Sequence, residues 1–144
     1  MSIEDNKAIA RRFIEEVFVA RDRAAVDDLA APDFTPHSWA TVEPGRESLK
    51  AAVDRVAAGL SQVTMTIDDM IAEGDRVAVR LTSSAVQSGT FMGLPPSGAR
   101  YSVPEIHVFR IRDGQVVEHW REMDSMSLMR QLGVGPASSG KAQA

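Results

Sequence analysis

Residues suited to proton transfer gather in one segment of the chain, where Glu105 and His107 stand two positions apart. Alternate side chains of a β-strand point to the same face, so the two groups would share one face. The other residues of that face are Tyr101, Val103, Phe109 and Ile111. A carboxylate and an imidazole within an apolar row are typical of a small-molecule pocket. A structural Glu–His hydrogen bond near a sheet edge is the alternative.

The next segment, 116–124, is denser in reactive groups than any other and contains His119, Trp120 and Asp124. Apolar residues fall on both of its faces, so alternation does not separate inside from outside. Asp124 directly precedes a predicted helix, where an Asp commonly caps by accepting backbone N–H bonds. Ser125 could cap instead, which would leave the Asp124 carboxylate free to face an apolar cavity and act as a general acid or base. Both alternatives stay open.

His37 lies between Pro36 and Trp39, in a proline-interrupted stretch predicted to be a loop. We expect it at the mouth of a cavity, and a surface histidine is the alternative. His37, His107 and His119 lack the spacing of known metal motifs, so no metal site is predicted. The chain has no cysteine, which excludes thiol nucleophiles, disulfides and thiolate ligands. No glycine-rich phosphate loop is present, so no nucleotide cofactor is expected.

The composition is that of a single globular domain. The 144 residues are 44% hydrophobic and 25% charged, and we expect one domain over 1–133 with a flexible tail over 134–144. The net charge of −4 gives no broad positive field, so nucleic acid is not an expected partner. The chain shows no signal-peptide pattern and no long apolar run, so we expect no membrane association and a cytoplasmic location.

Helix signals come first along the chain. Ser2 and Asp5 resemble a capping box ahead of a helix over 5–20, and Asp22 can cap a short second helix. A third helix is predicted after Gly45, and a last short helix over 125–132.

Strand signals follow from residue 62, where the hydrophobic period changes to two. One hairpin turns at Gly74-Asp75, and a second joins 100–112 to 115–123 through Asp113-Gly114. The intervening loop over 89–98 is long enough to form a lid or rim. Helices followed by antiparallel strands define an α+β fold, with the helices covering one face of a curved sheet.

The C-terminal third carries a family pattern. The run Phe-Arg-Ile-Arg-Asp-Gly-Gln-Val-Val-Glu-His-Trp over 109–120, then Asp124, then Gln131-Leu132-Gly133, resembles the SnoaL-like polyketide cyclases, also called ester cyclases. The shared features are an aromatic–Arg pair, a glycine turn, a Glu-x-Trp strand, an Asp and a closing Gln-Leu-Gly. Looser agreement extends to the first helix, to Asp-Phe-x-x-His at 33–37 and to Gly45.

This resemblance implies a fold of the nuclear transport factor two superfamily. In that fold a cone-shaped, curved antiparallel sheet wraps around N-terminal helices and encloses a cavity. The resemblance also implies a homodimer, often through the outer sheet face, and no cofactor. The implied reaction is an intramolecular aldol closure of an aromatic polyketide ester, in which an Asp removes a proton from carbon next to a carbonyl.

The resemblance also implies roles for particular residues. Asp124 matches the general base, His107 a cavity histidine and His37 a residue near the mouth. Alternation adds Glu105 as a third catalytic candidate. The predicted substrate-binding residues are His37, Trp39, Phe18, Trp120, His119, Tyr101 and Val103.

Two classes of function compete. The first is an enzyme that performs acid–base chemistry on a hydrophobic carbonyl compound, with a hydroxylase-like or hydrolase-like activity as a variant. The second is a module that binds a hydrophobic small molecule without chemistry. A purely structural dimerisation role would leave the placement of Glu105 and His107 unexplained. Fold and cavity alone do not select among these functions.

Overall fold

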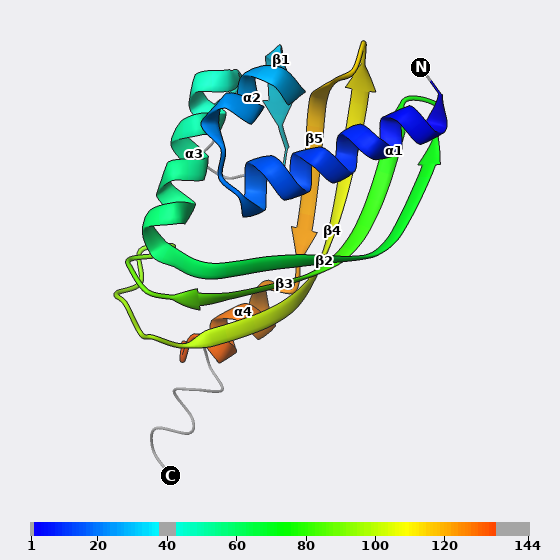
Figure 1. The fold of residues 1–144 in the computed structure, drawn as a ribbon. Coiled ribbons are helices and arrows are strands. Elements are labelled where there is room, and N and C mark those ends of the chain that lie inside the picture. The colour runs from blue at the N-terminus through cyan, green and yellow to red at the C-terminus, as the bar shows by residue number, and fades with distance from the viewer. Residues whose placement is uncertain (1, 38–42, 135–144) are drawn as a thin grey trace.

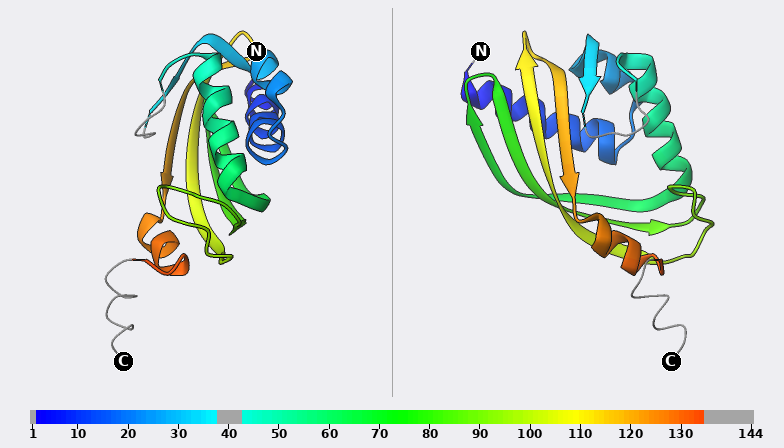
Figure 2. Two further views of the ribbon diagram at one scale, coloured as in Figure 1. Left: turned by 90° about the vertical axis from the view of Figure 1, so that its left-hand side faces the viewer. Right: turned by 180° about the vertical axis from the view of Figure 1, so that it is seen from behind.

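The computed structural model describes residues 2–37 and 43–134, which form one curved five-stranded sheet and its covering helices (Figure 1). The sheet order is β1-β5-β4-β3-β2. The strands are β1 (Ala30–Pro36), β2 (Leu60–Glu73), β3 (Arg76–Gln87), β4 (Arg100–Arg112) and β5 (Gln115–Met123). The long strands bend, and the N-terminal helices lie inside the bend (Figure 2). The predicted α+β class is confirmed.

The helices begin where the caps predict. They are α1 (Ile3–Arg12), α2 (Arg23–Leu29), α3 (Arg46–Gly59) and α4 (Ser125–Gln131). The Ser2 hydroxyl accepts the Asp5 N–H at 3.0 Å, and the Asp22 carboxylate accepts the Ala24 N–H at 2.9 Å. Both side chains satisfy donors that a helix start leaves unpaired. None of the helices formed by the described residues has the length and apolar character needed to cross a membrane.

The first helix continues past α1 as a wider π-helical segment, η1 (Phe13–Val19). Its hydrogen bonds span five residues, as from the Ala20 N–H to the Glu15 carbonyl at 2.9 Å. The Phe18 ring lies edge-on to the Phe13 ring, 5.3 Å away. The predicted helix over 5–20 is therefore continuous, and its second half carries Phe18 against the sheet.

The prediction of a loop over 33–39 is corrected in its first part, which lies in the strand segment 30–36. This segment forms β1, an edge strand parallel to β5, with Thr35 opposite Glu118 and Pro36 opposite His119. An edge strand pairs on one side only, so it tolerates a residue that has no N–H. The sheet is therefore mixed rather than wholly antiparallel. Trp39, predicted to contact substrate, lies outside the described residues.

Two apolar clusters fill the fold. The first lies beneath α1 and η1, where the fully buried Phe13 ring is 5.9 Å from Phe34 and 5.5 Å from Phe109. Burying one such side chain stabilises the fold by about 1.5–3 kcal/mol. The second cluster lies at the far end of β3 and β4. It consists of Leu60, Ala85, Tyr101, Val103, Leu128 and Leu132, and Val134, predicted to begin the tail, packs against it.

The loop after β3 is tied down by one buried amide. The Gln87 Nε2 donates to the carbonyls of Leu94 at 3.1 Å and Pro95 at 2.9 Å. Its Oε1 accepts the Ser97 hydroxyl at 2.6 Å. These bonds hold the segment over 89–98 at the end of β3, and its role as a lid or rim stays a prediction.

Gln131, from the closing Gln-Leu-Gly motif, completes the edge of β4 where β5 ends. Its Oε1 accepts the Ser102 N–H at 2.8 Å and its Nε2 donates to the Ser102 carbonyl at 3.1 Å. Because β5 ends at Met123, opposite Glu105, the side-chain amide takes the place of a strand neighbour for Ser102.

Replacing Gln131 by Ala is expected to lower the free energy of unfolding by about 1–2 kcal/mol, because two hydrogen bonds to Ser102 are lost. Urea denaturation measures this change. Arg130→Ala, at the exposed neighbouring position of α4, is the control and should change the free energy by less than about 0.5 kcal/mol. Equal effects of the two substitutions would contradict this role of Gln131.

Candidate functional site

A chain of three buried side chains joins β4 and β5, and we call it the Glu–His–His chain. His107 Nε2 lies 2.8 Å from Glu105 Oε1, and His107 Nδ1 lies 2.8 Å from His119 Nε2. All three side chains are excluded from solvent. In the β4–β5 register Phe109 is opposite His119, so alternation on both strands brings the three groups to one face. The predicted sharing of a face by Glu105 and His107 is confirmed.

Arg121 covers the carboxylate end of this chain. Its Nε donates to Glu105 Oε1 at 3.1 Å, and its Nη2 lies 3.4 Å from Oε2. The Arg121 side chain is 30% exposed while that of Glu105 is 0% exposed. Arg121 is therefore the member of the cluster through which solvent or a ligand approaches the buried carboxylate.

Burial and hydrogen-bond or charge partners shift the pKa of the Glu105 carboxyl in opposite directions. Burial alone would raise the pKa of the Glu105 carboxyl, but the hydrogen bond from His107 and the charge of Arg121 outweigh it and leave the pKa lowered. Burial lowers the pKa of His107 despite its carboxylate partner. Burial, together with the nearby His107 and Arg121, lowers the pKa of His119 well below its ordinary value. At neutral pH the chain therefore contains an ionised carboxylate and two neutral imidazoles.

These protonation states assign the hydrogen-bond directions. An ionised Glu105 only accepts, so His107 Nε2 carries a proton and donates it. The other nitrogen of neutral His107 then accepts from His119 Nε2–H. Both imidazole N–H groups therefore point toward the Glu105 carboxylate. These two hydrogen bonds hold the two rings in one orientation.

Phe18 forms an aromatic wall over the two imidazoles. Its ring lies 5.7 Å from His107 and 5.4 Å from His119. The Phe109 ring lies 4.7 Å from His119 on the same side of the sheet. Of the predicted wall residues, Phe18 thus lies at the Glu–His–His chain.

Tyr101 and Val103 occupy the same face of β4 as Glu105 and are buried in the second apolar cluster. Burial and the nearby Glu105 charge raise the pKa of the Tyr101 phenol, which hydrogen-bonds Ser83. Both residues lie toward the α4 end of the strand, beyond Glu105. Alternation predicted their face correctly, and contact with a substrate stays a prediction.

Trp120 and His37 lie on the opposite face of the sheet, away from the Glu–His–His chain. Their rings stack at 4.8 Å and 14°, and the Arg76 guanidinium lies 5.0 Å from the Trp120 ring. His37 Nε2 is 2.8 Å from Glu118 Oε2. The predicted grouping of these two residues with His107 is therefore not realised, because Trp120 directly follows the inward-pointing His119 and β1 brings His37 to the outer side.

The outer face also carries exposed apolar side chains. Ile71 is 69% exposed and Ile106 is 50% exposed. The homodimer implied by the family resemblance would cover such a face, and it stays a prediction.

Asp124 follows Met123, the residue opposite Glu105, and caps α4. Its Oδ1 accepts the Ser127 N–H at 3.0 Å, and the residue is exposed. The structure thus contains the capping alternative that the sequence left open beside the catalytic one. The catalytic role implied by the resemblance stays a prediction.

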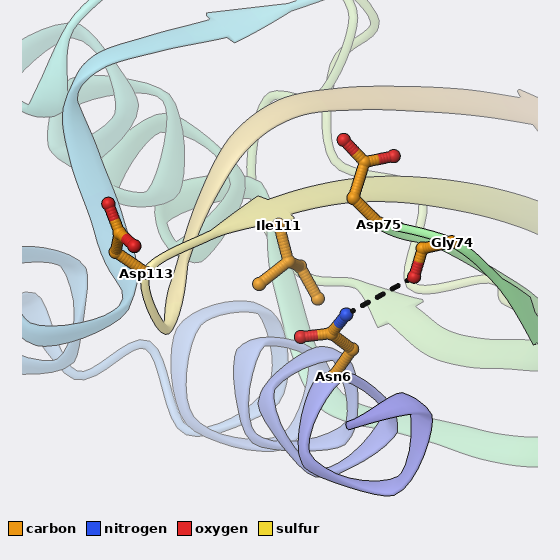
Figure 3. Close-up of a pocket in the computed structure, with 5 residues that line it drawn as sticks. All are labelled: Asn6, Gly74, Asp75, Ile111 and Asp113. Atoms are coloured by element: carbon orange, nitrogen blue, oxygen red, sulfur yellow. Dashed lines mark hydrogen bonds between the residues drawn. The ribbon is translucent and has the colours of Figure 1, made fainter. Parts of the chain in front are cut away.

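Two pockets lie beside α1, away from Glu105. One of about 390 Å³ is lined by Asn6, Gly74, Asp75, Ile111 and Asp113, and the Asn6 Nδ2 donates to the Gly74 carbonyl at 3.5 Å across it (Figure 3). The other, of about 480 Å³, lies between α1 and Met70. The internal cavity expected next to Glu105 stays a prediction. Among residues 2–37 and 43–134, no three His, Asp or Glu side chains are grouped as metal ligands.

Arg121 is the site residue that the sequence did not single out. It is opposite His107 in the β4–β5 register and has the same parity as His119. The available signal was that ionisable residues stand on both predicted strands, with Glu105 and His107 on one and Arg121 on the other. The pairing of the two strands was predicted, but a register shift between Arg110 and Ile111 places Arg121, rather than Trp120, opposite His107.

The chain belongs to the SnoaL-like polyketide cyclase family, whose model matches residues 8–132. It is 30% identical over 113 residues to the nogalonic acid methyl ester cyclase of Streptomyces nogalater, covering 75% of this chain and 83% of that protein. These similarities support a cyclase enzyme.

Solved structures agree with the family assignment. TsrD from Streptomyces laurentii is 34% identical, with a TM-score of 0.83 over 92% of this chain and 98% of its own. AclR from Streptomyces galilaeus, a candidate hydroxylase, is 27% identical, with a TM-score of 0.80 over 94% of this chain and 100% of its own. Proteins similar to this chain are therefore described by different reactions on one fold.

Proposed function

We propose that the protein is a cofactor-independent polyketide cyclase that closes a ring by aldol chemistry on a hydrophobic carbonyl ester. The observation that carries the proposal is the buried carboxylate of Glu105, held ionised and oriented by His107 and Arg121. A carboxylate that is ionised at neutral pH and held in one orientation is able to accept a proton from carbon.

Proton transfer by Glu105 accounts for every atom of such a closure. The carboxylate takes a proton from the carbon next to one carbonyl, and the resulting enolate carbon bonds to a second carbonyl carbon. The new alkoxide oxygen then takes the proton back from Glu105, so the product is an isomer of the substrate. His107 keeps its Nε2–H on the carboxylate and fixes which oxygen faces the substrate.

Access to Glu105 depends on Arg121, because the guanidinium covers the carboxylate. Substrate access to Glu105 Oε2 therefore requires Arg121 Nη2, 3.4 Å away, to turn from that oxygen, while Nε keeps its hydrogen bond to Oε1 at 3.1 Å. Phe18 supplies an apolar surface beside the imidazoles for a flat substrate.

The test uses the compounds named for two relatives. Nogalonic acid methyl ester is one, and aklanonic acid methyl ester is the other, named for the Streptomyces peucetius cyclase DnrD, 35% identical over 60 residues. Purified protein dialysed against EDTA is expected to convert at least one ester to an isomer of unchanged mass, and adding metal ions should not alter the rate. Chromatography with mass detection measures the product.

Other results of the ester assay would favour a binding module or a hydroxylase, or would contradict a mechanism without a cofactor. Saturable binding of the esters without conversion would favour the binding module over the enzyme. A product one oxygen atom heavier than the ester would favour a hydroxylase. Loss of conversion after dialysis against EDTA, restored by a metal ion, would contradict the cofactor-independent mechanism.

A further inference from the structure

Among the described residues, one donor edge of the Arg121 guanidinium makes only a single weak contact. Its Nε and Nη2 point to the two oxygens of Glu105. Among the described residues, Nη1 makes no hydrogen bond, and Nη2 has as its other contact the Met123 sulfur at 3.8 Å. A thioether is a weak acceptor, which an oxygen would readily replace. The planar group therefore offers two parallel N–H donors on the side away from Glu105.

This free edge lies at the approach to the buried carboxylate. The Arg121 side chain is partly exposed, and the Glu–His–His chain behind it is not. A ligand arriving from solvent thus meets the guanidinium before it meets Glu105.

Two parallel N–H donors bind two coplanar oxygens best. Loss of the proton between the two carbonyls of a 1,3-dicarbonyl compound spreads a negative charge over two such oxygens. A single ketone offers one neutral oxygen, on which the two parallel donors can converge only with bent hydrogen bonds. The donor geometry thus distinguishes the two classes of compound.

On the basis of the proposed function, we propose that the outer edge of Arg121 binds both oxygens of a 1,3-dicarbonyl group as its enolate and so determines substrate specificity. Nε of the same planar group keeps its hydrogen bond to Glu105 Oε1, which leaves Oε2 to take the proton from carbon. One rigid guanidinium would thereby fix the distance between the base and the carbon it deprotonates. The apolar surroundings of Phe18 and Met123 suit the hydrophobic remainder of such a compound.

Binding of two small probes tests this specificity. Benzoylacetone has two carbonyls, and butyrophenone has the same skeleton with one. Titration calorimetry with the full chain is expected to give a Kd for benzoylacetone about 10- to 100-fold lower than for butyrophenone. Arg121→Met should reduce this preference to less than about threefold and leave butyrophenone binding within about twofold. Equal binding of the two probes by the unmodified protein, or a preference that survives in Arg121→Met, would overturn the proposal.

A second variant covers the case in which Arg121→Met does not fold. Arg121→Lys keeps the positive charge beside Glu105 and removes the planar fork, so the preference for benzoylacetone should still fall. Circular dichroism checks the fold of both variants. An unchanged preference in folded Arg121→Lys would overturn the bidentate geometry.

Glu105→Gln separates this inference from the proposed function. The amide oxygen still accepts from Arg121, so the benzoylacetone preference should persist while turnover of the ester is lost. Persistent turnover together with a persistent preference would contradict the role of Glu105 as base and leave the Arg121 inference standing. Loss of the preference with turnover intact would contradict the Arg121 inference.

Discussion

Replacing Glu105 by Gln is expected to lower kcat for ester cyclisation about 10²- to 10⁴-fold, because a neutral amide cannot take the proton from carbon. The substitution keeps an acceptor for His107 and Arg121 and changes the side-chain volume little. Initial rates measured at saturating ester give the change in kcat.

Glu122→Gln is the matched control for that variant. Glu122 is an exposed carboxylate on β5, opposite Ile106 on the outer face. The same chemical change there should leave kcat within about twofold. A Glu105→Gln enzyme as active as the Glu122→Gln control would show that Glu105 is not the base.

Acidification is expected to destabilise the fold through its buried histidines. Burial lowers the pKa of His107 and of His119 below the ordinary value of 6.5. Below pH 6.5 the unfolded chain therefore binds protons that the folded chain excludes, so stability falls as the pH falls. Each imidazole contributes a slope of up to about 1.4 kcal/mol per pH unit.

Protonation of Glu105 lowers the stability of the fold further in more acidic solution. Its pKa is lowered in the folded state, so the stability it contributes is present above its ordinary value of 4.5 and is lost as the pH falls through the folded value. Protonation of the histidines and protonation of Glu105 both lower the stability as the pH falls. The histidine effect begins at the higher pH.

Urea denaturation at several pH values between about 7 and 5 measures this slope. His119→Gln is the matched variant, since its amide can donate to His107 Nδ1 and does not titrate. Its slope should be smaller by up to about 1.4 kcal/mol per pH unit. An unchanged slope would mean that His119 is not held neutral by the fold.

Local patterns predicted those elements whose neighbours in space are also close in sequence. The capping residues Ser2 and Asp22 marked helix starts, and Asp113-Gly114 marked the β4–β5 turn. Alternation placed Glu105 and His107 on one face because a strand covered by helices on one side has an unambiguous inner row.

Long-range pairing accounts for what the patterns missed. β1 was predicted as a loop because its prolines interrupt the local signal, and its partner β5 lies about 80 residues later in the chain. The faces of β5 stayed ambiguous because Trp120 is partly covered on the outer side by His37 and Arg76. The Arg121 contact with Glu105 likewise depends on strand register, which composition does not specify.

The choice between two carboxylates is the most direct test of the proposed mechanism. Measured side by side on the same ester, Glu105→Gln and Asp124→Asn give two values of kcat. Asn can replace Asp as an N-cap, so Asp124→Asn should preserve α4. The predicted result is a loss of about 10²- to 10⁴-fold for Glu105→Gln and of less than about threefold for Asp124→Asn. The reverse order, with Asp124→Asn inactive and Glu105→Gln active, would contradict it.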